Sequence, residues 1–71
     1  MRWIKNYSGS LVNLDRAYFI YVEDMGREWA VMADFLFHNQ EEDKIEKIYL
    51  KVFKTEEEAN EYIEAILIRL S

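Results

Sequence analysis

A capping box at Thr55 to Glu58 is the feature that most constrains how this chain folds, because it fixes where a strand-like run becomes a helix. The Thr55 hydroxyl can accept the backbone N–H of Glu58, and the Glu58 carboxylate can reach back to the N–H of Thr55. We therefore predict a helix from about Glu56 to Leu70, packed on one face of a sheet built from residues 2–53. Beyond the cap, apolar residues recur at helical spacing, namely Tyr62, Ile63, Ile66, Leu67 and Leu70.

The length and composition indicate one small folded domain covering residues 1–71. Because 51% of the residues are hydrophobic, the chain is not a disordered acidic segment. It contains no cysteine, which excludes disulfides and thiolate zinc sites and favours a reducing compartment. Its start lacks a targeting signal, and no apolar run approaches the ~20 residues of a membrane helix. We expect a soluble, cytoplasmic protein.

The residues before the helix carry the pattern of an antiparallel sheet. The clearest hairpin joins residues 17–22 to residues 28–37 through a turn at Gly26, which supplies a positive φ at low cost. The predicted fold class is α+β, an antiparallel β-meander of about four to five strands with one C-terminal α-helix packed on one face. In the returning strand, alternation places on one face Trp29, Val31, Ala33, Phe35 and Phe37. Two shorter strands and the turn between them are expected at residues 2–5, 11–14 and 6–10.

The segment 45–53 fits two periodicities. Ile45, Ile48 and Val52 match helical spacing, whereas Ile48, Leu50 and Val52 also match one face of a strand. We predict a strand because β-branched and aromatic residues dominate, and because Thr55 would otherwise cap a helix that is already running. A helix at 45–52 remains the alternative. The polar stretch at 38–44 is expected to be a solvated loop.

Three features follow one another along the chain: the bend Asn13-Leu14-Asp15-Arg16, aromatic and β-branched strands ending in Phe53, and a final helix that begins Thr-Glu-Glu-Glu-Ala. In this order the chain resembles a loose group of small uncharacterised bacterial and phage proteins. The resemblance implies an antiparallel meander with a C-terminal helix, and it implies no activity. The chain departs from the group in having a long acidic loop at 41–43 in place of a short glycine turn.

Few residues could carry catalysis or bind a metal. His38 is the only histidine, so a metal site would need carboxylates alone or a second chain. The acidic run at 41–43 lacks the alternating ligands and central glycine of a calcium loop. Asp34 interrupts an apolar strand, but a solvent-face aspartate paired with Arg16 is favoured over a general acid or base. We predict no catalytic residue, no metal and no cofactor, and therefore no enzyme.

Apolar residues point to both sides of the predicted strands, and one helix can cover only one side. Monomers seldom leave large apolar patches in water, so the second face is expected to close into a barrel or, as we favour, to bury itself against a second copy in a homodimer. Alternation does not tell which set of residues faces the helix. The candidate interface residues are Phe19, Tyr21, Trp29 and Phe35.

The predicted function is a small cytosolic interaction or assembly module that associates with itself through an apolar sheet face. The alternative is an acidic effector or nucleic-acid mimic that binds a basic partner surface, for which the 41–43 loop and Glu57, Glu61 and Glu64 would have to form one negative face. The net charge of −5 makes nucleic acid and anionic membranes unfavourable partners, although a local basic patch could override it.

Overall fold

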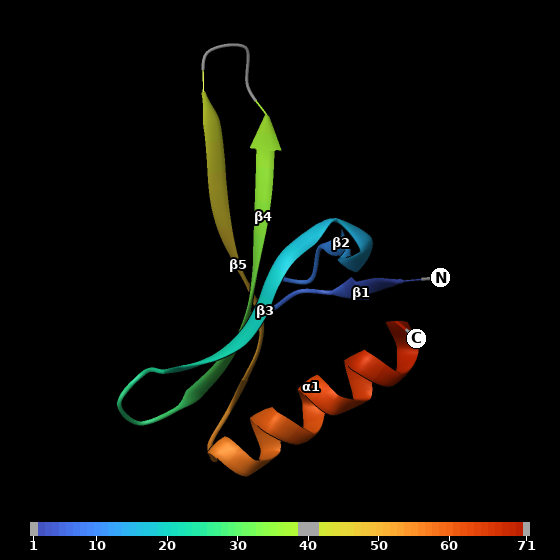
Figure 1. Cartoon of the computed structure of the whole chain (residues 1–71). Helices are drawn as coiled ribbons and strands as arrows, with labels where there is room; N and C mark the ends of the chain where they lie inside the picture. Colours follow the sequence, from blue (N-terminus) through green and yellow to red (C-terminus); the bar gives the residue numbers. More distant parts are fainter. Residues whose placement is uncertain (1, 39–41, 71) are drawn as a thin grey trace.

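The computed structural model describes residues 2–38 and 42–70. Within these residues the chain forms an antiparallel three-stranded sheet in the order β3-β4-β5, a separate two-stranded sheet β1-β2, and one C-terminal helix α1 (Figure 1). The α+β class is confirmed, and so is the meander-like strand order. The elements are β1 (Trp3–Lys5), β2 (Leu11–Asn13), the 3-10 helix η1 (Leu14–Arg16), β3 (Ala17–Asp24), β4 (Trp29–His38), β5 (Asp43–Phe53) and α1 (Glu56–Leu70).

The ambiguous segment before the helix is a strand. β5 pairs antiparallel with β4 from Trp29 opposite Phe53 to His38 opposite Asp43. The prediction of a loop over 38–44 was wrong at both ends, because His38 still belongs to β4 and Asp43 and Lys44 already belong to β5. Polar side chains are tolerated there because this part of the ladder is exposed to solvent.

The first two strands do not join the main sheet. They pair only with each other, with Ile4 opposite Val12, and they lie on the same side of the main sheet as α1 (Figure 1). Ile4 and Leu14 are buried in the common core, so the hairpin acts as a second cover beside the helix. A single continuous sheet was therefore the wrong expectation for residues 2–14.

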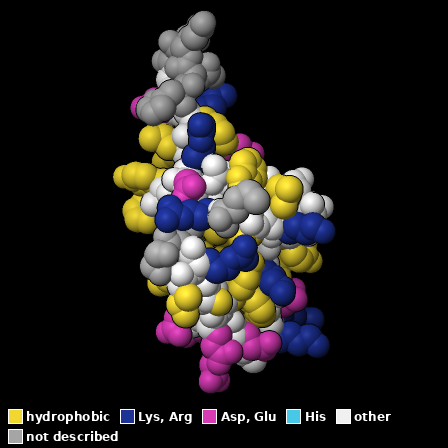
Figure 2. All heavy atoms as spheres, turned by 90° about the vertical axis from the view of Figure 1, so that its right-hand side faces the viewer, with side chains coloured by type: hydrophobic (Ala, Val, Ile, Leu, Met, Phe, Trp, Pro, Cys, Tyr) yellow, Lys and Arg dark blue, Asp and Glu magenta, His cyan; other side chains and the backbone are white. Residues whose placement is uncertain are grey.

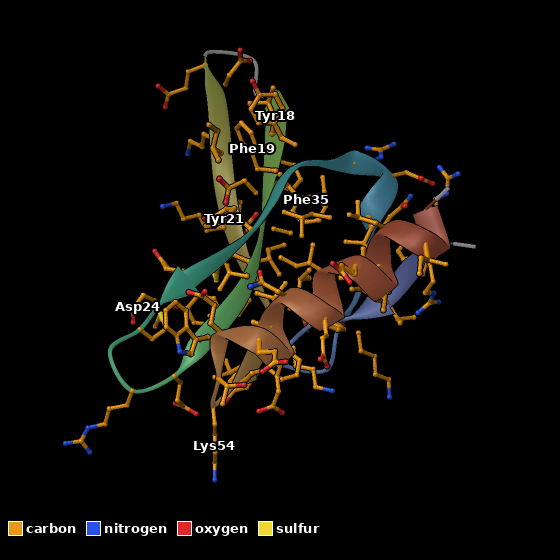
Figure 3. All side chains as sticks on the ribbon, turned by 60° about the horizontal axis from the view of Figure 1, so that its bottom comes forward. Tyr18, Phe19, Tyr21, Asp24, Phe35 and Lys54 are labelled. Carbon is orange, nitrogen blue, oxygen red and sulfur yellow. The ribbon has the colours of Figure 1, made fainter. Side chains whose placement is uncertain are left out.

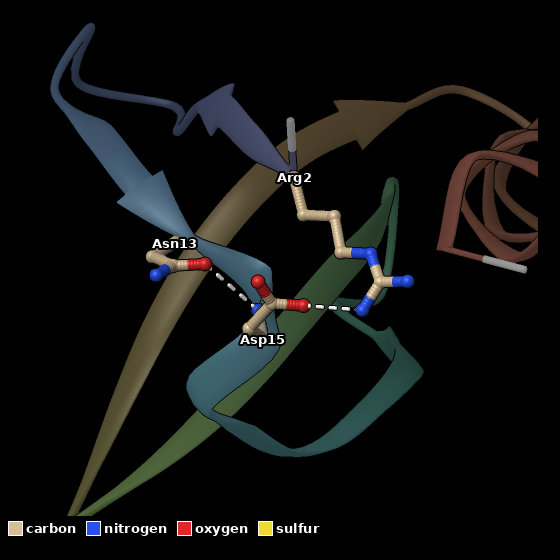
Figure 4. A network of polar contacts seen from close by, with 3 residues as sticks. All are labelled: Arg2, Asn13 and Asp15. Carbon is tan, nitrogen blue, oxygen red and sulfur yellow. Dashed lines mark hydrogen bonds and ion pairs between the residues drawn. The ribbon is translucent and has the colours of Figure 1, made fainter.

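A short polar network turns the chain from β2 into β3 (Figure 4). The Asn13 side chain accepts the backbone N–H of Asp15 at 3.0 Å and caps η1. The Asp15 carboxylate in turn accepts from the Arg2 guanidinium at 2.7 Å, which ties the start of β1 to this turn. Both ionic groups are exposed, so the pair adds little stability and acts mainly to fix geometry.

The core lies between the main sheet and its two covers. Val31, Ala33 and Phe35 of β4 face this side, as the alternation predicted, and they meet Ala59 and Ile66 of α1. Ala33 and Ala59 are fully buried, and their small side chains let the helix approach the sheet closely. Burial of this face provides the main hydrophobic stabilisation, at roughly 25 cal/mol per Å² of apolar surface.

Two irregularities change the alternation of the strands. In the β3-β4 ladder the register shifts between Ala17 and Phe19. In the β4-β5 ladder it shifts between Val31, which pairs with Lys51, and Met32, which pairs with Tyr49. At the second site Leu50 is the extra residue, and it is buried in the core. A bulge of this kind inverts the phase of the residues beyond it.

The predicted faces of β5 were therefore wrong after the bulge. Strict alternation puts Ile48, Leu50 and Val52 on one face, whereas in the structure Phe53 packs against the core after Leu50. Val52 instead lies opposite Ala30, on the other side of the sheet.

The turns at each end of the body follow local sequence signals. Gly26 has a φ of 96°, and the Asp24 carboxylate accepts its N–H at 2.8 Å. At the start of α1 the Glu58 N–H donates to Thr55 Oγ1 at 3.2 Å, the hydrogen bond expected of the cap. The Thr55 hydroxyl donates to the Glu58 carboxylate at 3.0 Å, so the return contact engages the hydroxyl where the sequence predicted the backbone N–H. Over the described residues, no helix is both long and apolar enough to pass through a membrane.

Candidate functional site

The main sheet has one side that neither α1 nor the β1-β2 hairpin covers, which we call the open face. The register places three cross-strand rows on it, centred on Ala30, Met32 and Asp34 of β4. Beyond these rows, Leu36 and Ile45 extend the face toward the end of the hairpin. The flanking residues are Glu23 and Val52 beside Ala30, Tyr21 and Tyr49 beside Met32, and Phe19 and Lys47 beside Asp34.

The open face is apolar at its centre and exposed at its margins. Met32 is almost fully buried although no helix or strand layer covers it, because the larger tyrosines of the two neighbouring strands flank it. By contrast, 58% of the Phe19 side chain is exposed, as is 40% of Tyr49. Phe19 also packs edge-on against Tyr18, with ring centroids 4.7 Å apart. Aromatic groups are therefore presented to solvent across the face.

The end of the β4-β5 hairpin forms an arm that extends beyond β3. Pairing between β3 and β4 ends at Ala17 opposite Phe35, so the later residues of β4 pair only with the early residues of β5 (Figure 1). Leu36 and Ile45 are exposed on its open side, and Phe37 is exposed on its other side. Because an isolated two-stranded ribbon is at best marginally stable in water, this arm has the least support from its own chain.

A polar pair lies beside the apolar centre of the open face, between the Met32 row and the Asp34 row. The Tyr21 hydroxyl donates to the Asp34 carboxylate at 2.9 Å across the β3-β4 ladder. Burial of the phenol, followed by its hydrogen bond to Asp34, raises the pKa of Tyr21 to about 12. Tyr21 is therefore protonated at neutral pH and remains a hydrogen-bond donor. The expected partner of Asp34 was Arg16, and this was wrong, because Arg16 lies beside Phe35 on the covered side of the sheet.

One border of the open face is shaped by the N-terminal hairpin. The Tyr7 N–H donates to the Tyr49 carbonyl at 2.8 Å, which brings the β1-β2 turn to the outer edge of β5. Residues 6–8 and the open-face residues Met32 and Lys47 line a shallow depression of about 480 Å³ there. The depression is open to solvent and gives the face a concave margin.

The structure separates the four residues that the sequence offered as an interface. Phe19 and Tyr21 lie on the open face, on the far side of β3 from α1, whereas Phe35 points toward the helix (Figure 3). Phe35 is only 6% exposed, and Trp29 packs partly buried against the same core. The open face also contains Ile45 and Tyr49, which the sequence reading left out because the phase of β5 was uncertain before its register was known.

The remaining candidates add no chemical centre. Residues 39–41 and the side chain of His38 lie outside the described part, so the expectations for them stay predictions. No group of three or more His, Cys, Asp or Glu residues is placed to hold a metal within residues 2–38 and 42–70. Thr55 and Glu58 act at the start of α1, away from the open face.

The acidic segments do not gather on one surface. Asp43 lies near the end of the arm, whereas the acidic start of α1 lies at the opposite end of the molecule (Figure 1). The negative face on which the acidic-effector alternative depends is therefore not formed by these two segments.

Comparison with known proteins provides no relative. No protein-family model matches the chain, and no curated protein or solved structure is similar to it. The fold and the open face define an α+β protein in which one face of the main sheet is not covered by α1 or by the β1-β2 hairpin. The resemblance to small bacterial and phage proteins stays a prediction.

Proposed function

We propose that this chain is a small cytosolic interaction or assembly module that forms a two-fold homodimer through the open face and the arm. The observation that carries the proposal is the exposure of aromatic and aliphatic side chains along one continuous sheet surface, from Phe19 and Tyr49 to Ile45. Interface cores are enriched in aromatic residues and methionine, as this face is. The proposal gives the chain no enzymatic role.

The arm supports a partner at this position. It exposes Leu36 and Ile45 on one side and Phe37 on the other, and no further strand of its own sheet pairs with it. A second chain packed along the open side of the arm would bury Leu36 and Ile45 and stabilise a ribbon that is weak alone.

The open face carries both acidic and basic side chains, which favours a second copy of the chain over a strongly acidic or strongly basic partner. Asp34 and Lys47 lie side by side in one cross-strand row, and Glu23 lies two rows away. Under a two-fold axis the same patch serves both subunits, so Lys47 of one chain can lie opposite the partner's Asp34. A strongly acidic or strongly basic partner would meet a like charge in either case.

The required area is available. A standard interface buries about 800 Å² on each partner, which is about a seventh of the 5552 Å² of accessible surface of this chain. The open face and the arm beyond it run from the Ala30 row to the Leu36–Ile45 pair, about 20 Å along the strands at roughly 3.3 Å per residue.

Sedimentation equilibrium tests the proposal. We expect the protein to sediment at twice its mass of 8.6 kDa at micromolar concentration and to remain dimeric at high salt, since the contact is mainly apolar. Ile45→Asp should give a folded monomer, because the interface would then bury an unpaired carboxylate. Leu67→Asp is the matched control, since Leu67 is equally exposed but lies on α1. It should remain dimeric.

Phe19→Asp provides a second disruption on the opposite outer strand of the face, one cross-strand row from Ile45, should the arm variant fail to fold. A monodisperse monomer in the unmodified protein would overturn the proposal. So would dissociation that is equal for Ile45→Asp and Leu67→Asp.

A further inference from the structure

A second surface, separate from the open face, has the composition of a ligand site. A groove of about 610 Å³ runs between the β1-β2 hairpin, β5 and α1. Small-molecule sites are typically clefts of roughly 300–1,000 Å³, so this groove has the volume of such a site. It does not include any residue of the three central rows of the open face except Val52.

Three cations from three different elements line this groove. They are Lys5 of β1, Lys51 of β5 and Arg69 of α1. No Asp or Glu is among the described residues that line it, although acids outnumber bases by 14 to 9 in the chain. On the side of the molecule where β1 and the C-terminal end of α1 lie, several Lys and Arg side chains occupy the middle, and the largest group of acidic ones lies at the bottom (Figure 2). The potential in the groove is therefore positive in an otherwise acidic protein.

The groove also contains aromatic and aliphatic surface. Trp3 and Tyr62 are among its lining residues, and Leu50 and Leu11 provide apolar contacts. The Lys51 ammonium lies 5.6 Å from the centre of the Tyr62 ring and 5.5 Å from that of Phe53, which holds this cation above the aromatic surface. Burial raises the pKa of Tyr62, and the nearby Arg69 opposes this shift, so Tyr62 is a neutral hydroxyl beside a cation at physiological pH.

We propose that this groove binds a small organic anion, one that carries a phosphate or carboxylate group on a planar apolar body. The cations Lys5, Lys51 and Arg69 would hold the anionic group, and Trp3 and Tyr62 would contact the apolar part. Guanidinium and ammonium groups form charge-assisted hydrogen bonds with such oxygens. Of the three central rows of the open face only Val52 lines this groove, so its binding can be tested separately from the dimer.

Phenyl phosphate is a suitable probe, followed by nitrogen-15 NMR of the full chain. We expect saturable shifts of the Trp3 indole N–H and of the backbone around Lys51 and Arg69. The Trp29 indole should not move, because Trp29 is not among the residues that line the groove. Inorganic phosphate should bind more weakly than phenyl phosphate, and benzyl alcohol should not bind, because each lacks one half of the recognised chemistry.

Charge-neutral variants locate the binding. Lys51→Gln and Arg69→Gln should each weaken phenyl phosphate binding about tenfold, the loss expected for one charge-assisted hydrogen bond. Lys54→Gln and Arg27→Gln remove equal charges outside the groove and should leave the affinity unchanged. Ile45→Asp should bind as the unmodified protein does, whether or not it is monomeric, which separates this site from the proposed dimer.

Three results would overturn the proposal. The first is an equal loss of affinity in all four charge variants, which indicates nonspecific attraction. The second is equal binding of inorganic phosphate and phenyl phosphate, which leaves no role for the aromatic surface. The third is tighter binding of a short single-stranded oligonucleotide at the same residues, which would make the groove a nucleic-acid site.

Discussion

The two faces of the main sheet are both apolar, yet the chain covers only one of them. On the covered face Val31, Ala33 and Phe35 lie beneath α1 and the N-terminal hairpin, whereas on the open face Phe19 remains in solvent. Side-chain composition alone therefore does not reveal which face is buried. Burial is decided by where the separate hairpin and the helix pack, and the open face is left to another molecule.

The largest change in stability is expected from a comparison of two phenylalanines, one on each face. Phe35→Ala should cost about 3–5 kcal/mol of unfolding free energy, because it removes a ring that is 6% exposed and leaves a cavity. Phe19→Ala, where the ring is 58% exposed, should cost less than about 1 kcal/mol when the protein is monomeric. Urea denaturation below the dissociation concentration measures both. Equal losses would show that the two faces are equally buried in solution.

Leu50 tests whether the bulge belongs to the covered face. Leu50→Ala should cost about 2–4 kcal/mol, since the extra residue of the ladder is buried in the core. Val52→Ala, two positions later and opposite Ala30, should cost less because its side chain is only partly buried. Thermal denaturation of the two variants compares them. A loss for Val52→Ala close to that for Leu50→Ala would indicate that β5 keeps strict alternation, which puts both side chains on one face.

Removing the N-terminal cap of α1 tests how much the cap stabilises the helix that covers the sheet. Thr55→Ala should cost about 0.5–2 kcal/mol, because the Glu58 N–H loses its side-chain acceptor at 3.2 Å. Thr55→Ser retains the hydroxyl and should restore most of the loss. Chemical denaturation followed by helical circular dichroism provides the measurement. An unchanged free energy of unfolding in Thr55→Ala would show that the cap does not stabilise α1.

The smallest effect is expected from Tyr21 on the open face. Its pKa of about 12 lies above the ordinary value of 10, so folding favours the neutral phenol. This contribution is complete below pH 10 and is lost as the pH rises from 10 to about 12. Absorbance titration of the phenolate should show a late-ionising tyrosine that Tyr21→Phe removes. Asp34→Asn should lower its pKa, and an unchanged titration in both variants would contradict the Tyr21–Asp34 contact.

Local signals made most of the fold predictable. The cap at Thr55 fixed the start of the helix, Gly26 marked the clear hairpin, and β-branched residues identified β5 as a strand. The phase of β5 was not predictable, because the bulge at Leu50 depends on how that side chain packs in the core. The separate β1-β2 sheet was missed for the same reason, since nothing local to these strands shows that they pack across the sheet instead of extending it.

The candidate site was predictable only in part. Alternation placed Phe19 and Tyr21 on one face of β3 and Ile20 and Val22 on the other. Which of these faces is covered depends on contacts distant in sequence, such as that of Ile4 with the core. Ile45 could have been found from the strand pattern once the register was known. The cationic groove was beyond the sequence reading, because Lys5, Lys51 and Arg69 are brought together only by folding.

The hydrogen bond from Tyr7 to Tyr49 makes the two edges of the main sheet unequal. A foreign strand running along β5 would meet residues 6–8, whereas no described residue pairs with the outer edge of β3. Open-ended fibril growth by strand addition requires two unpaired strand edges on every molecule. The turn therefore hinders strand addition at the middle of β5, whereas the outer edge of β3 has no such cover among the described residues. By blocking part of one edge, the small N-terminal hairpin disfavours the repeated addition of strands from other molecules.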